Sequence, residues 1–162
     1  MRVRPVGAAG TAAVLGMVLV GCGVQPTGVV DAGEPASGLT RGMRLYYASA
    51  DGLRAVPLID REVDDLNGVL KLLGQEPPEG LISLVRLGGY SATGSGARVT
   101  VRVDGLYGDS GRDQGTGQLV CTLARAQSVL EPEVGPDDVE VTLRPSEGAA
   151  LGPYRCADFL NR

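Results

Sequence analysis

Histidine is absent from this chain of 162 residues, and its absence removes several chemistries together. Without imidazole there is no Ser-His-Asp or Cys-His catalysis, no imidazole general base, and no zinc site of the usual Cys and His ligand sets. Tryptophan is also absent, and the chain has one phenylalanine and three cysteines. The composition therefore argues against an enzyme, and we predict no catalytic residue, no metal site and no cofactor.

Long apolar runs are missing too, apart from one near the N-terminus. Residues 6–20, VGAAGTAAVLGMVLV, carry no charge and follow Arg2 and Arg4. A run of about 15 residues is within the range of a secretory signal, whereas a transmembrane helix needs roughly 20 residues. We therefore predict an export signal over residues 1–21.

A cysteine ends this run, in the sequence LVGC at residues 19–22. These four residues resemble the lipobox of bacterial lipoproteins, in which the cysteine carries the lipid and becomes the first residue after cleavage. The resemblance implies a lipid anchor at Cys22 and a position on the extracytoplasmic side of the cell membrane. The alternative is an ordinary secretory signal in which Cys22 has no role. Residues 22–42 are rich in Gly, Pro, Ser and Thr, which predicts a flexible tether.

Basic residues are few, with 15 Lys and Arg against 19 Asp and Glu, and Lys71 is the sole lysine. Loss of Arg2 and Arg4 with the signal would make the excess of acidic residues larger still. Such a balance does not favour binding to nucleic acid or to an anionic membrane surface. We therefore expect no nucleic-acid partner, and expect the lipid to be the link to the membrane.

Residues 43–145 read as one globular domain of the α+β, or α/β, class, followed by a tail at 146–162. Val99, Val101 and Val103 alternate with polar residues, as in a strand buried on one face. The expected elements are strands 43–48 and 53–59, a helix from 62 to 73, strands 81–87 and 99–103, a helix over 118–130, and a strand at 139–143. Residues 88–97 are expected to be a loop. This ββαββαβ order predicts a two-layer sandwich, with both helices on one face of a mixed sheet.

Three segments carry a resemblance to a known family. MRLYYASADGLRAVPLIDREV, VLKLLGQEPPEGLIS and GTGQLVCTLARAQSVLEPEVGPDDVEVTLRPSEG are similar to successive parts of the GerMN domain, a sporulation and spore-germination module. The resemblance covers residues 43–148. It implies a secreted or lipid-anchored envelope domain that acts by binding or assembly. The family supplies no agreed catalytic residues, so none is carried over.

The strand pattern places Arg98, Arg102, Arg144 and Tyr46 on the sheet face opposite the helices. One interpretation is a solvated face on which long side chains lie along the surface. The other is an interface for an acidic partner or for a self-assembling ring. The partner would then be an unidentified envelope protein, a wall polymer or a second copy of this chain. A small-ligand-binding receptor lipoprotein is the alternative function.

Cys121 and Cys156 remain once Cys22 is assigned to the lipid. Export to an oxidising compartment lets a disulfide persist, and Cys121 falls on the side of its helix away from the expected sheet contact. The tail around Cys156 contains Tyr154 and Phe159, which could cover that side. We therefore predict a Cys121–Cys156 disulfide that fixes the C-terminal tail. The alternative is two unpaired thiols in a frayed terminus.

The first testable prediction concerns the anchor. Changing Cys22 to Ala should move the protein from the detergent phase to the aqueous phase, because acyl chains contribute about 0.8 kcal/mol for each buried CH₂. Phase partitioning followed by immunoblotting measures the change, with Cys121→Ala as the control that keeps the lipidation site. If the Cys22→Ala protein still partitions with detergent, the anchor assignment is wrong.

Overall fold

The computed structural model describes residues 42–59, 61–85, 89–104 and 112–160. The predicted signal at 1–21, Cys22 and all of the tether except residue 42 lie outside these ranges. In the part of the chain that is described, no helix is long and apolar enough to cross a membrane. The described residues belong to the α+β class, as predicted, with six strands and three helices among them.

The N-terminal hairpin forms where the sequence predicts it. Strand β1 (Arg44–Ser49) pairs antiparallel with β2 (Gly52–Pro57), and the two are joined by a tight turn. Gly52 has a φ of 116°, a value that glycine adopts at little cost and that other residues rarely adopt. Leu45 and Tyr47 are buried, so one face of the hairpin packs on the rest of the chain.

The second sheet has four strands in the order β3-β4-β5-β6. These are β3 (Ser91–Ser95), β4 (Arg98–Val103), β5 (Glu140–Pro145) and β6 (Leu151–Tyr154). Strands β4 and β5 are parallel because a helix connects them, and the other two pairs are antiparallel. The alternating valines of β4 are buried under the helices, as the sequence pattern indicates.

Three helices accompany the strands: α2 (Leu66–Leu73), α3 (Gln114–Leu130) and the short α4 (Ala157–Leu160). Aspartates begin the two longer ones. The Asp65 carboxylate accepts a hydrogen bond from the Gly68 N–H at 2.7 Å, and the Asp113 carboxylate accepts one from the Thr116 N–H at 2.8 Å. These N-caps satisfy amide groups that have no partner inside the helix. Both helices therefore begin a few residues away from the predicted starts.

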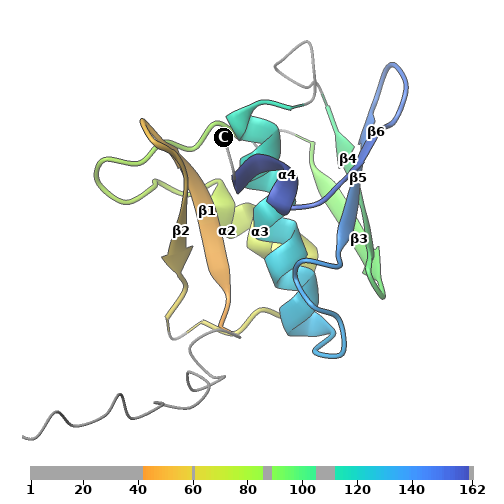
Figure 1. Cartoon of the computed structure of the whole chain (residues 1–162), viewed down its shortest axis with the longest axis horizontal. Helices are drawn as coiled ribbons and strands as arrows, with labels where there is room; N and C mark the ends of the chain where they lie inside the picture. The colour runs from red at the N-terminus through yellow and green to blue at the C-terminus, as the bar shows by residue number, and fades with distance from the viewer. Residues whose placement is uncertain (1–41, 60, 86–88, 105–111, 161–162) are drawn as a thin grey trace, which may run out of the picture. The chain divides into compact units, whose positions relative to one another are not determined.

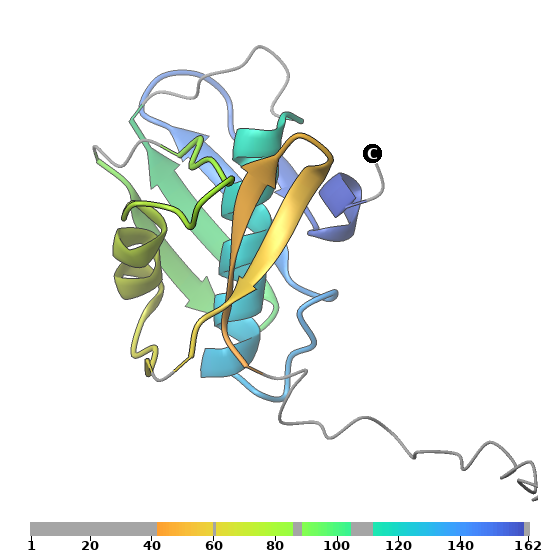
Figure 2. The same ribbon diagram turned by 90° about the vertical axis from the view of Figure 1, so that its left-hand side faces the viewer.

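The elements form three layers rather than the predicted two. The hairpin β1–β2 is a separate sheet, and the helices lie between it and the four-stranded sheet (Figure 1). Figure 2 shows the hairpin crossing in front of α3. The reason is the composition of α3, in which every residue from Thr116 to Ala124 is buried. A helix that is apolar or small on all sides needs cover on more than one face.

One predicted strand is displaced along the chain. The expected strand at 81–87 contributes only an isolated bridge between Ile82 and Ala48, and its last two residues lie outside the described ranges. The strand lies instead at Ser91–Ser95, inside the segment predicted to be a loop. Its inner face offers only Ala92 and Gly94, which give no apolar alternation to recognise. A side chain at Gly94 would collide with Gln127, so the strand must be small there.

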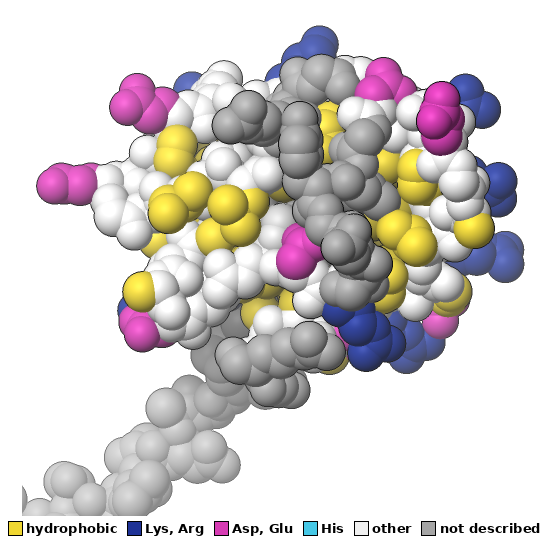
Figure 3. Space-filling model, turned by 90° about the horizontal axis from the view of Figure 1, so that it is seen from above, with side chains coloured by type: hydrophobic (Ala, Val, Ile, Leu, Met, Phe, Trp, Pro, Cys, Tyr) yellow, Lys and Arg dark blue, Asp and Glu magenta, His cyan; other side chains and the backbone are white. Residues whose placement is uncertain are grey.

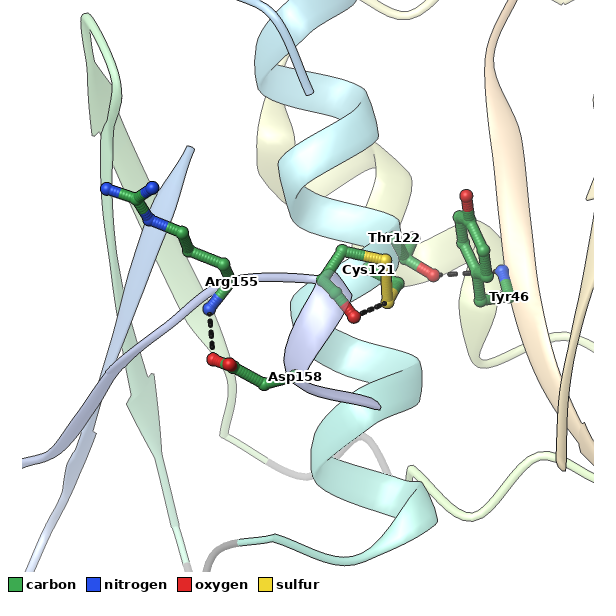
Figure 4. The surroundings of a disulfide bond; sticks show 6 residues. Tyr46, Cys121, Thr122, Arg155 and Asp158 are labelled. Carbon is green, nitrogen blue, oxygen red and sulfur yellow. Dashed lines mark hydrogen bonds between the residues drawn. A yellow bond between two sulfur atoms is a disulfide. The ribbon is translucent and has the colours of Figure 1, made fainter. Parts of the chain in front are cut away.

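The C-terminal tail is structured. It supplies strand β6 and helix α4, and the predicted disulfide between Cys121 and Cys156 is present, with Cα atoms 4.5 Å apart (Figure 4). Phe159 packs so closely on α3 that a Cβ added to Gly117 would approach it to 2.8 Å. The tail therefore covers the side of α3 on which Cys121 lies, as the sequence predicts.

The disulfide generates the second prediction. Replacing Cys121 and Cys156 together by Ser should lower the free energy of unfolding by about 3–4 kcal/mol, because the bond closes a loop of about 36 residues. Urea unfolding of the oxidised and the doubly substituted protein measures the difference. Two alkylatable thiols in the oxidised mature protein, detected by intact mass, would contradict the bond itself.

Candidate binding face

Three of the four predicted interface residues share one surface. Arg98 and Arg102 on β4 and Arg144 on β5 are exposed, while the residues between them are buried under the helices or half-buried beside them. Tyr46 does not belong with them, because β1 is part of the other sheet. The Tyr46 N–H donates to Thr122 Oγ1 at 3.0 Å, on the hairpin side of α3 (Figure 4). The predicted placement of Tyr46 is therefore wrong. It assumed one sheet, whereas β1 and β2 form a separate sheet on the other side of the helices.

The strand register arranges the surface in rows. Ser91 pairs with Arg102 and Arg102 with Arg144, while Thr93, Thr100 and Thr142 form the next row, two residues along. The third row runs through Ser95, Arg98 and Glu140. We call these nine residues the polar face: Ser91, Thr93, Ser95, Arg98, Thr100, Arg102, Glu140, Thr142 and Arg144. All of them are exposed or half-buried, and none of the described helices packs on that side of the sheet (Figure 1).

The polar face is basic on an acidic protein. It carries three arginines and one glutamate, whereas the whole chain has a net charge of −4. The glutamate is already engaged, since Glu140 Oε1 accepts a hydrogen bond from Arg155 Nη2 at 2.8 Å, and this bond raises the pKa of Arg155 above its ordinary value. Seen from above, Lys and Arg side chains project along the side of the molecule that carries the four-stranded sheet (Figure 3).

Arg102 and Arg144 are direct neighbours in the parallel pair, so their Cα atoms lie about 5 Å apart. Like charges placed opposite each other across strands are destabilising. Among the described residues, no carboxylate lies within ion-pair distance of either guanidinium group. The two side chains border a hollow of about 380 Å³ at the end of the sheet, which Asp104, Ser146 and Gly148 also line.

Polar side chains from the helices hold the sheet beneath this face. Gln127, which is 2% exposed, donates to the Gly96 carbonyl at 2.9 Å, and the Glu131 carboxylate accepts from the Gly96 N–H at 3.0 Å. Asn67 on α2 exchanges two hydrogen bonds with the backbone of Ala92, at 2.8 and 3.2 Å. The β3–β4 turn and the β3 edge are thus fixed from behind. These contacts are not predicted from the sequence. Their one indication there is Gln127, a polar residue at a helix position that faces the sheet.

A second hollow, of about 370 Å³, lies where α3 meets the following loop and is lined by Arg125, Val129, Pro132 and Val134 among others. Burial holds the pKa of the Arg125 guanidinium below its ordinary value. The described ranges contain no group of three or more Cys, Asp or Glu residues that could hold a metal ion. The polar face differs from this hollow in carrying its charged groups in a regular array set by the strand register.

Comparisons with protein-family models, with curated proteins and with solved structures found no match to this chain. The resemblance to the GerMN domain and the lipobox assignment stay predictions.

The Arg102–Arg144 neighbours generate the third prediction. Changing Arg144 to Gln should raise the free energy of unfolding by about 0.2–1 kcal/mol at low salt, because Arg102 loses a like-charged neighbour. The gain should shrink as salt screens the pair. The matched control is Arg54→Gln, which removes an arginine from β2 and breaks only an exposed pair with Asp51 at 3.8 Å. A loss of stability by Arg144→Gln would mean that its side chain is needed for packing.

Proposed function

We propose that the chain is a lipid-anchored envelope protein that acts as a non-enzymatic binding or assembly module. The polar face of the four-stranded sheet is the observation that carries the proposal. The face has three arginines and five hydroxyl-bearing residues in register, and it is not covered by any described helix. Binding would take place there, through charge and hydrogen bonds.

The membrane link in this proposal depends on the sequence. The apolar run, the lipobox-like LVGC and the Gly- and Pro-rich residues after Cys22 support a lipid anchor followed by a tether. A coil of about 20 residues has a root-mean-square reach of about 25 Å. That reach is sufficient to let the folded part present its polar face away from the lipid surface, on the extracytoplasmic side.

The charge of the face supports an acidic partner. A basic patch on an otherwise acidic protein attracts anionic molecules locally, while the remaining surface repels them. Such a distribution orients an approaching polyanion towards one side. It favours recognition of an envelope polymer or an acidic envelope protein over an apolar protein interface, which would need large apolar anchors.

A small-ligand-binding receptor lipoprotein is the alternative function that the sequence allows. Ligand sites of that kind are usually apolar cavities that bury most of the ligand. The hollow beside Arg102 and Arg144 is open at the end of the sheet and lined largely by polar or small residues. These properties favour a surface that binds part of a larger partner over a cavity that encloses a small ligand.

The fourth prediction tests the face. Changing Arg98 and Arg102 together to Glu should reduce crosslinked recovery of the envelope partner by at least about tenfold, since the charge of the face is reversed. The thermal midpoint should stay within a few degrees, because both side chains are exposed. The control is Arg54→Glu with Arg61→Glu, which makes the same charge change at residues outside the four-stranded sheet.

Two results would contradict the proposal. Equal partner recovery by both double variants would show that the polar face is only a solvated surface. A collapse of the thermal midpoint in Arg98→Glu with Arg102→Glu would show that the face is buried structure.

A further inference from the structure

We infer that the hollow beside Arg102 and Arg144 binds the phosphodiester group of a polyol-phosphate polymer. The inference rests on the proposed function, in which the polar face binds an envelope partner, and it names the chemistry of that partner. The hollow lies where β4 and β5 end, at the head of the three rows of polar side chains.

The two arginines are placed for one shared anion. Their backbones lie about 5 Å apart on parallel strands, and both side chains leave the sheet on the same face. An anion held between them would relieve the repulsion that their pairing creates. Guanidinium groups bind oxyanions through paired N–H donors, with carboxylates and phosphates both able to accept in this way. The oxygens of a tetrahedral phosphate do not lie in one plane, so two guanidinium groups can approach it from different sides.

The charge of the hollow fits a single negative charge. Arg102 and Arg144 contribute two positive charges, and Asp104, which also lines the hollow, contributes one negative charge. Asp104 forms no ion pair with either arginine among the described residues. A phosphodiester carries one negative charge, so its binding brings the hollow to neutrality. Ser146 lines the same hollow, and a serine hydroxyl can donate to a phosphate oxygen.

The rows behind the hollow fit the rest of such a polymer. The next row carries three threonines, Thr93, Thr100 and Thr142, whose hydroxyls can pair with polyol hydroxyls. Arg98 lies four residues before Arg102 on β4, which is a distance of about 13 Å at the rise of a strand. A second phosphate further along the polymer would contact Arg98. The nine residues of the face include no aromatic side chain, which argues against recognition by stacking on neutral sugars.

The test is calorimetric titration of the full mature chain with poly(glycerol phosphate). Polygalacturonate at equal charge concentration serves as the carboxylate polymer, and dextran as the neutral polyol. Poly(glycerol phosphate) should bind, polygalacturonate should bind at least about fivefold more weakly, and dextran should not bind. Arg102→Gln with Arg144→Gln should weaken binding by about tenfold or more. The control, Arg54→Gln with Arg61→Gln, should change binding less than about twofold.

Absence of binding, equal affinity for polygalacturonate, or equal losses in the two double variants would each overturn the inference. If the Arg102 and Arg144 double variant does not fold, Arg144→Gln replaces it, with an expected loss of about threefold or more. The proposed function has a separate outcome. If poly(glycerol phosphate) fails to bind while partner recovery still depends on Arg98 and Arg102, only the phosphate assignment is wrong.

Discussion

The burial of α3 on nearly every side is the constraint on which the rest of the structure depends. Its residues from Thr116 to Ala124 are all buried, so neither a single sheet nor a single hairpin could cover it. The chain supplies cover from several directions, with the four-stranded sheet on one side, the β1–β2 hairpin on another and the tail on a third (Figure 2). The disulfide to Cys156 holds that third cover, which is too short to be stable alone.

Buried polar residues of α3 also help to hold the layers around it together. The hairpin and the segment after α2 do not join the four-stranded sheet, so some of their backbone groups need other partners. Thr122 accepts from the Tyr46 N–H, and Gln118, which is fully buried, accepts from the Leu84 N–H at 2.9 Å. These side chains connect the layers and leave few ways to repack α3. A buried polar group that loses its partner costs about 1–3 kcal/mol, so the contacts also select one arrangement.

Much of this fold could be predicted from the sequence, and the failures have physical reasons. The hairpin, both long helices, the β4 and β5 strands and the disulfide follow from periodicity, turn residues and cysteine count. Strand β3 could not be found, because its inner positions are Ala92 and Gly94 and its outer ones are Ser and Thr. The third layer could not be predicted, because a helix expected to bury one side only is in fact buried at Thr116, Gln118 and Thr122 as well. Of the candidate site, the three arginines were placed correctly because strand alternation is local. Tyr46 was misplaced because sheet membership depends on the whole chain.

The polar face is the side of the four-stranded sheet on which no described helix packs, and this is why we propose a binding role for it. The buried valines and leucine of β4 and β5 face the helices, so packing constrains the outer side chains of these two strands little. Folding therefore does not require three arginines there. Repulsion between the two that are neighbours opposes this arrangement. The sheet beneath is held from behind by Gln127, Glu131 and Asn67, so the rows keep their spacing without help from a ligand. An array of like charges held in place before binding, with the cost in stability that its repulsion predicts, is the expected property of a binding surface formed in advance of its partner.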